Sequence, residues 1–209
     1  MLVPTLVALL VCALAQLVSA DSIDPSTLVG TWSSGAGNVL TGQNHDGLLT
    51  QTSFYNPVKR QFTVPATSGY SYSFSADGHF ETAQFFYESN PSSPSCFNAT
   101  LLWQHGTYKV SGSQLTMTPY KGDGAVQSMG QCLKPQVRLD YYSQVEHMSN
   151  WTTFVETDVV FFPDAKSMYG LQMYKDNGIP VPKMYLQFRP PQMMPTKSIF
   201  KQVIGAPGS

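Results

Sequence analysis

The chain has 209 residues, which is enough for one domain of ordinary size with a sizeable core. Its 12 basic and 13 acidic residues leave a net charge of −1, and only 12% of all residues are charged. This balance argues against nucleic acid or an anionic membrane surface as a partner, because both require clustered lysine and arginine.

The chain opens with a segment typical of a secretory signal peptide, residues 1–20. Leu2 to Val18 form an almost unbroken apolar run without an acidic residue. The run ends in Val18-Ser19-Ala20, small residues of the kind that a signal peptidase reads. We therefore expect the mature protein to begin after Ala20, in an oxidising secretory compartment.

Cysteines and glycosylation sequons point to the same compartment. Removal of the signal peptide removes Cys12 and leaves Cys96 and Cys132. Two thiols in an oxidising lumen tend to pair, so a Cys96–Cys132 disulfide is predicted. Sequons begin at Asn98 and Asn150, and both side chains are expected to be exposed enough to carry glycans.

Alternating apolar and polar residues predict an antiparallel all-β domain. Tyr70 to Phe74 alternates strictly, Asp77-Gly78 is a strong hairpin signal, and Phe80 to Tyr87 follows as an aromatic-rich strand. The same order of strand, turn and strand recurs around Gly112 and Gly178. Turn signals spaced this evenly indicate a lipocalin-like up-and-down barrel, with a β-sandwich as the alternative.

The mature chain is predicted to form one lumenal domain, residues 21–197, followed by a flexible tail, residues 198–209. Leu28 to Trp32 starts this domain, and Trp32 is expected to close one end of the barrel with its indole over the core. No second apolar run approaches the roughly 18 residues needed to cross a bilayer.

Two segments rich in Gly, Pro and Ser are predicted to be surface loops. They are Ser89 to Cys96 and Lys121 to Gly130. Cys96 and Cys132 lie at the edges of these segments, so their disulfide is expected to join the two regions.

No catalytic or metal-binding motif is present. The four histidines are not spaced as a metal pair, and nucleophile-elbow, Walker and Rossmann motifs are absent. We therefore expect no metal, no cofactor and no catalytic residue. A glycosidase would need two carboxyls about 5–9 Å apart across a cleft. For acidic residues such as Glu81 and Glu146, solvated strand faces are the preferred interpretation.

Aromatic residues are abundant, and most of them must form the core. Three doublets, Phe85-Phe86, Tyr141-Tyr142 and Phe161-Phe162, cannot place both members on one face of a regular strand. Some exposed aromatic surface is therefore expected.

Several strings, taken in order, resemble a known fungal family. The most specific are Trp103-Gln104-His105-Gly106-Thr107-Tyr108 and the segment from Arg189 to Thr196, Arg-Pro-Pro-Gln-Met-Met-Pro-Thr. From about residue 28 to 197 the chain is similar to the "reversal of TOR lethality" proteins, fungal chaperones of the endoplasmic reticulum. The residues that carry the family motif are Trp32, Trp103, His105, Gly106, Arg189, Pro190 and Pro191.

The resemblance implies a non-enzymatic folding factor for secretory and cell-wall glycoproteins, needed for normal β-1,6-glucan levels. Its implied partners are maturing glycoproteins and other lumenal chaperones. Family members typically end in a single membrane-spanning helix, and this sequence contains none. Two alternatives stay open: a lipocalin-like binding module for a glycan or apolar ligand, and a cell-wall glycosidase.

Overall fold

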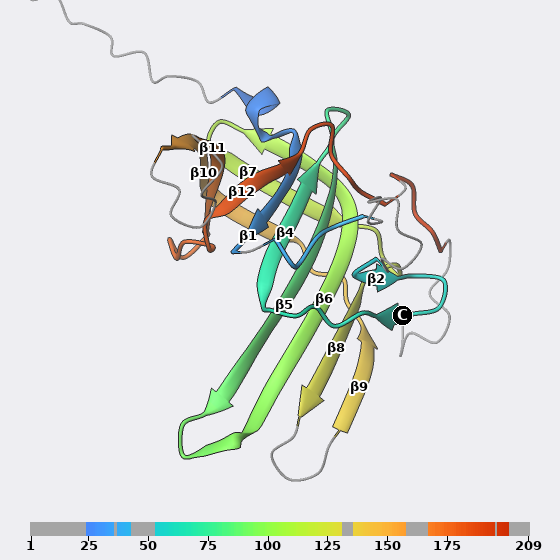
Figure 1. Cartoon of the computed structure of the whole chain (residues 1–209). Coiled ribbons are helices and arrows are strands. Elements are labelled where there is room, and N and C mark those ends of the chain that lie inside the picture. The colour runs from blue at the N-terminus through green and yellow to red at the C-terminus, as the bar shows by residue number, and fades with distance from the viewer. Residues whose placement is uncertain are drawn as a thin grey trace, which may run out of the picture.

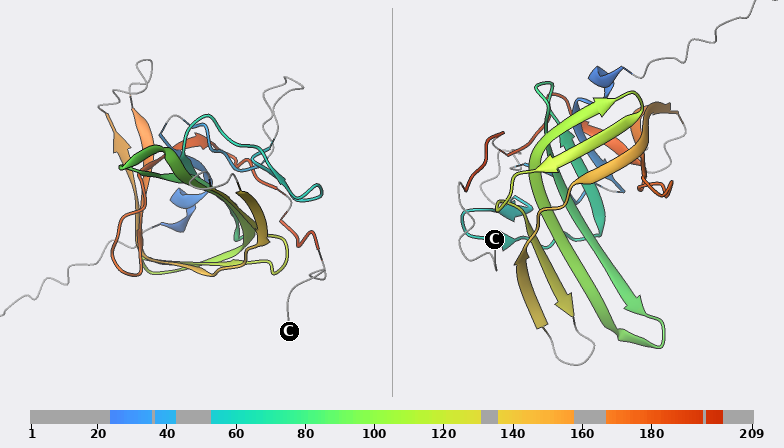
Figure 2. Two further views of the ribbon diagram at one scale, coloured as in Figure 1. Left: turned by 90° about the horizontal axis from the view of Figure 1, so that it is seen from below. Right: turned by 180° about the vertical axis from the view of Figure 1, so that it is seen from behind.

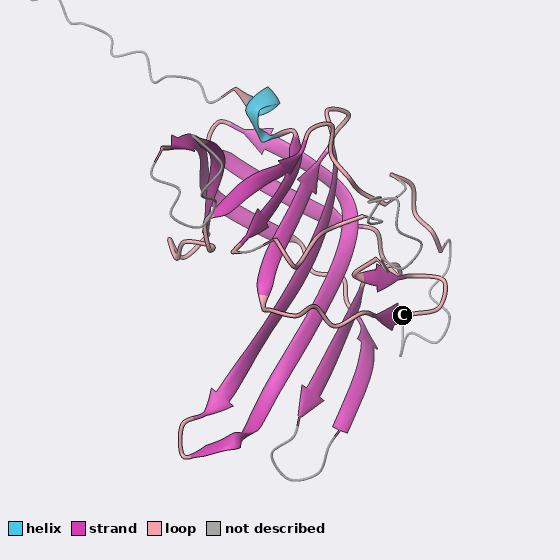
Figure 3. Cartoon of the chain, in the orientation of Figure 1, coloured by secondary structure: helices cyan, strands magenta, loops and turns pink. Residues whose placement is uncertain are grey.

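The computed structural model describes residues 24–35, 37–42, 53–130, 136–157, 167–194 and 196–200. The predicted signal peptide and Cys132 lie outside these residues. One 3₁₀ helix and the strands of two sheets make up the described chain (Figures 1 and 3). The elements are η1 (Pro25–Leu28), β1 (Gly30–Ser34), β2 (Tyr55–Asn56), β3 (Gln61–Phe62), β4 (Gly69–Phe74), β5 (His79–Asn90), β6 (Ser93–Ser111), β7 (Gln114–Pro119), β8 (Ala125–Gly130), β9 (Gln136–Tyr141), β10 (Glu146–Glu156), β11 (Met168–Lys175) and β12 (Met184–Phe188).

Eight strands form a closed antiparallel ring. Their order round the ring is β1, β4, β5, β6, β7, β10, β11 and β12, which is also their order along the chain. The ring closes where β12 pairs with β1. The predicted up-and-down barrel is thus confirmed, and the alternative of a sandwich is wrong. Figure 2 shows the ring viewed from below.

Two hairpins are inserted into this meander, β2–β3 after β1 and β8–β9 after β7. β6 is 19 residues long and belongs to two parts of the fold. Its second half pairs with β7 inside the ring, and its first half pairs with β8 outside it. Together with the far half of β5, these strands extend from the barrel as a four-stranded sheet, β5-β6-β8-β9, which we call the arm (Figure 1).

The hairpins predicted from turn chemistry are present. Gly78, Gly112 and Gly178 have φ values of 86°, 61° and 78°, in the left-handed region that glycine adopts without strain. A Cβ added to Gly112 or Gly178 would meet no atom within 4 Å. Backbone conformation, not lack of space, is therefore the reason for glycine at these two turns.

The two predicted loops are mostly strand, and only residues 91–92 and 121–124 form turns. β5 continues to Asn90 and β6 begins at Ser93, so only two residues form the turn between them. The Ser92 N–H donates to Asn90 Oδ1 at 2.9 Å and tightens that turn. In the other segment β8 begins at Ala125, which is fully buried. In the first segment β5 and β6 pair with each other, and in the second β8 pairs with β6. Local composition does not reveal such partners.

Large apolar side chains pack the barrel interior. Trp32 is fully buried, and its Nε1 donates to the Leu28 carbonyl of η1 at 2.7 Å, at one end of the barrel as expected. The described side chains of the interior thus form a packed core. Its buried members are Leu28, Trp32, Tyr72, Phe74, Phe80, Leu115, Met117, Met148, Trp151, Leu171, Met173, Val181 and Met184.

A second core lies on the other face of β5 and β6. Tyr55 of β2 packs on Phe62 of β3 and on Trp103 of β6, with ring centroids 4.5 and 4.9 Å apart. The hairpin β2–β3 therefore covers the base of the arm. The buried members are Val39, Phe54, Tyr55, Phe62, Ala83, Phe85, Ala99, Leu101, Trp103, Ala125 and Met194.

Candidate functional site

An apolar groove of about 490 Å³ lies on the arm, beyond the part that the hairpin β2–β3 covers. It is lined by all four strands of the arm and by Val64, which follows β3. Uncharged side chains make up its whole described lining. The lining residues are Val64, Phe85, Tyr87, Ser89, Phe97, Ala99, Met129, Gly130, Gln136 and Val137.

The strand register explains why a hollow forms here. Tyr87 pairs with Ala99, Ala99 with Met129, and Met129 with Val137, so these four side chains form one row across the arm. Side chains in such a row point to the same face of the sheet. The short Ala99 side chain stands between two long ones, and the groove passes over it.

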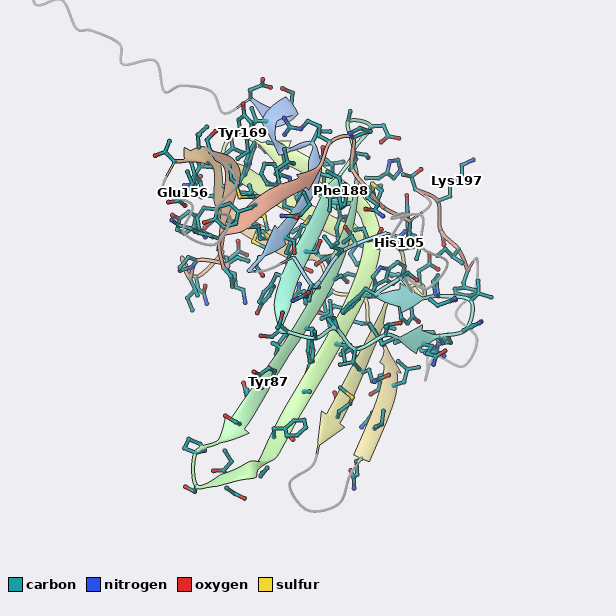
Figure 4. The ribbon with its side chains drawn as sticks, in the orientation of Figure 1. Tyr87, His105, Glu156, Tyr169, Phe188 and Lys197 are labelled. Carbon is teal, nitrogen blue, oxygen red and sulfur yellow. The ribbon has the colours of Figure 1, made fainter. Side chains whose placement is uncertain are left out.

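The groove continues the second core into solvent. Phe85 is 7% exposed and belongs to that core, whereas Tyr87, two residues further along β5, is 56% exposed. Their ring centroids are 6.2 Å apart. Val137 is 69% exposed at the outer strand. Figure 4 shows Tyr87 on the arm, away from the barrel. An open apolar strip of this kind marks an interaction surface.

The opposite face of the arm is polar toward its tip. Asn98 and Ser128 alternate with groove residues and are exposed. On β9, Arg138 and Asp140 form an ion pair with an Nε–Oδ2 distance of 2.6 Å. A glycan on Asn98 would therefore project away from the groove. Asn150 is exposed on β10 beside buried Trp151, and glycosylation of both asparagines stays a prediction.

The aromatic doublets have three outcomes. Phe85 faces the second core, whereas Phe86 faces the other side and stacks on Tyr70, with centroids 6.4 Å apart. Tyr141-Tyr142 is half-buried. Phe161-Phe162 lies outside the described residues. Strand alternation predicted exposed aromatic surface, and the row through Tyr87 provides it, but no sequence signal singled out that residue.

Three family-motif residues, Trp103, His105 and Arg189, lie elsewhere, around the C-terminal strap, which we define as residues 189–194 and 196–200. Trp103 Nε1 and the Gly42 N–H donate to Glu81 Oε1 at 2.8 and 2.9 Å, and the Met194 N–H donates to its Oε2. Glu81 is 1% exposed, and burial raises its pKa. The prediction that it lies on a solvated strand face is wrong, because strap and loop donors satisfy it.

A second buried carboxylate holds the next part of the strap. Asp123 Oδ2 lies 2.9 Å from His105 Nε2 and accepts the Ile199 N–H at 2.6 Å. Its Oδ1 accepts the Phe200 N–H at 2.8 Å. The His105 ring stacks on Trp103 at 4.9 Å (labelled in Figure 4). The first residues of the predicted tail 198–209 are thus bonded to the domain, and residues 201–209 lie outside the described chain.

Close packing and one arginine complete this arrangement. A Cβ on Gly106 would lie 2.1 Å from the Thr118 carbonyl oxygen, so only glycine fits. Arg189 donates to the carbonyls of Val29 at 2.7 Å and Thr27 at 2.9 Å, and the bond to Pro190 is cis. Gly106 thus allows β6 to approach β7 closely, and Arg189 joins the start of the strap to the segment before β1.

Among the described residues, the carboxylates of Glu81 and Glu146 are each held by hydrogen bonds within the domain. Glu81 is bonded on both oxygens, and Glu146 accepts Tyr72 Oη at 2.8 Å and Gln104 Nε2 at 2.7 Å. The described lining of the groove contains no carboxyl group. Cys96 is buried on β6, and because Cys132 lies outside the described residues, their pairing stays a prediction.

A family model described as "Chaperone for protein-folding within the ER, fungal" matches residues 28–204. The chain belongs to the Rot1 family. It is 35% identical to Protein ROT1 of Candida glabrata over 189 residues, covering 90% of this chain and 65% of that relative. It is 36% identical to Protein rot1 of Schizosaccharomyces pombe, covering 89% and 74%. No solved structure matches.

The family is one of fungal chaperones for protein folding in the endoplasmic reticulum, as the resemblance implied. The chain spans about two thirds of the length of the Candida glabrata relative. Within the described residues, no helix has the length and apolar character needed to cross a membrane.

Proposed function

We propose that this chain is a non-enzymatic lumenal folding factor that binds exposed apolar segments of maturing secretory and cell-wall glycoproteins in the groove of the arm. The observation that carries this is an open, uncharged apolar groove on a domain whose barrel is otherwise packed. Apolar contact is non-directional and grows with area, so it accepts clients of many sequences.

The mode of action follows from what the sequence lacks. Without a nucleotide-binding motif, the chain has no means of driving cycles of binding and release with ATP. Contact with clients is then weak and reversible. The polar reverse face, with the sequon at Asn98, keeps the other side of the arm in water while the groove is occupied.

The test is suppression of aggregation of a chemically denatured protein at near-stoichiometric ratios without ATP. Tyr87→Asp and Val137→Asp place a charge in the groove at exposed positions, where folding tolerates the change. Ser128→Asp adds the same charge next to Met129 on the reverse face and is the matched control. We expect suppression to fall several-fold in the two groove variants only. Equal activity in all three variants would overturn the assignment of the groove.

A further inference from the structure

The outer edge of the arm indicates how a client segment lies. We infer that an extended client segment adds to β9 as a further strand and places every second side chain into the groove. This inference rests on the proposed function and specifies its geometry. It starts from the sheet order, in which β9 is the last strand and pairs only with β8 in the part of the chain described.

The direction of the backbone groups on β9 follows from one hydrogen bond. The Tyr142 N–H donates to the Gly124 carbonyl at 3.0 Å, in register with the β8–β9 ladder. Hydrogen-bonded and non-hydrogen-bonded pairs alternate along an antiparallel ladder. The even-numbered residues of β9 therefore bond to β8, and the N–H and C=O groups of Val137 and Leu139 point to the outer edge.

The side chains of the same two residues lie on the groove face. Val137 lines the groove, and Leu139 packs against the second core. A client residue that pairs with Val137 would extend the row formed by Tyr87, Ala99 and Met129. Val137 and Leu139 thus offer a client both outward backbone groups and apolar side chains on the groove face.

Charge defines the chemistry of the client. On the groove face the described lining is uncharged, so the client side chains placed there must be uncharged and apolar. On the other face Arg138 and Asp140 neutralise each other across 2.6 Å, so polar side chains of either sign are tolerated. The partner is a segment that alternates apolar and polar residues, the pattern of an unpaired β-strand in an unfolded protein.

β9 has few of the features by which proteins protect an edge strand. Gln136–Tyr141 contains no proline and no lysine, its pairing with β8 is regular over six residues, and its two charges are mutually paired. An edge of this kind is suited to strand addition, in which main-chain bonds give affinity and alternate side chains give selectivity.

The experiment uses the full chain and a fluorescent peptide of alternating Val and Thr, followed by anisotropy. A second peptide carries N-methyl groups on its Val residues, which leaves its side chains unchanged and removes the N–H donors that would face β9. We expect the N-methyl peptide to bind about tenfold more weakly, as the loss of one or two net hydrogen bonds requires. Because the protein is unaltered, misfolding cannot produce this result.

Two variants test the protein side. Val137→Pro removes the backbone N–H that points to the outer edge. Val137→Ala shortens the side chain but keeps this N–H. We expect Val137→Pro to bind the parent peptide about tenfold more weakly than Val137→Ala. Suppose that both peptides bind equally well while Tyr87→Asp still weakens the suppression of aggregation. This result would overturn strand addition but not the proposed binding of clients in the groove. Concentration-dependent dimers that the peptide does not dissociate would also overturn strand addition, in favour of pairing between copies.

Discussion

Glu81, Trp103, His105 and Asp123 hold the strap on the domain, and we call these four residues the clamp. Glu81 gives the most direct test of the clamp. Its carboxylate accepts the N–H groups of Gly42 and Met194 and the indole N–H of Trp103, all in a site that is 1% exposed. Glu81→Ala leaves these donors buried without an acceptor. At about 1–3 kcal/mol for each unsatisfied donor, the loss would be about 3–9 kcal/mol.

Part of this destabilisation is offset, because alanine also removes a buried charge. The raised pKa of Glu81 means that burial disfavours its charge, and alanine removes this cost. We therefore expect a net destabilisation in the lower part of that range, about 3–5 kcal/mol. Glu81→Gln keeps one acceptor oxygen and should fall between alanine and the wild type.

The assay is equilibrium urea unfolding, with Glu88→Ala on the exposed part of β5 as the matched control. Trypsin cleavage after Lys197, which is exposed on the strap, reports whether the strap is released (Figure 4). A Glu81→Ala protein as stable as Glu88→Ala, with unchanged cleavage, would show that the carboxylate does not hold the strap.

Two further outcomes are expected. Trp32→Ala, a large-to-small change in the packed barrel, should lower the free energy of unfolding by about 3–5 kcal/mol in the same assay. A variant as stable as the wild type would show that Trp32 does not contribute to the core. Burial raises the pKa of Glu146 above its ordinary 4.5, so the folded state binds more protons than the unfolded state between 4.5 and the folded pKa. The free energy of unfolding should fall as pH rises through that window, and less steeply in Glu146→Gln; identical slopes would contradict this.

The barrel could be predicted because its signals are local. Asp77-Gly78 and the strict alternation before it specify a hairpin through turn geometry and side-chain period alone. The arm could not be predicted in this way. Pro91, Ser92 and the serines around them have the composition of a loop, yet they lie at the end of the β5–β6 hairpin. The segment Ala125–Gly130 also has the composition of a loop, and it becomes a strand by pairing with Asn98–Trp103 of β6, 22 to 32 residues earlier in the chain.

The groove and the clamp escaped prediction for a related reason. Tyr87, Ala99, Met129 and Val137 belong to four strands, and only the register makes them one row. Glu81 and the strap lie more than a hundred residues apart in the chain. The sequence did mark Trp103 and His105 through the family resemblance, but it did not say what they bind.

The position of the clamp explains why motif residues of a folding factor need not contact a client. Met194 of the strap is buried in the second core, and Ile199 packs against it. That core is a single apolar layer: the strap and the hairpin β2–β3 cover one end of it, and the groove opens at the other. If the strap left the barrel, the covered end of the layer would also be exposed. Copies of the chain would then associate with one another through this layer as readily as with a client. Trp103 and His105, through Glu81 and Asp123, therefore keep the open part of the layer to the length of the groove. In the proposed function, this restriction lets a domain that itself stays folded offer an apolar surface to unfolded proteins.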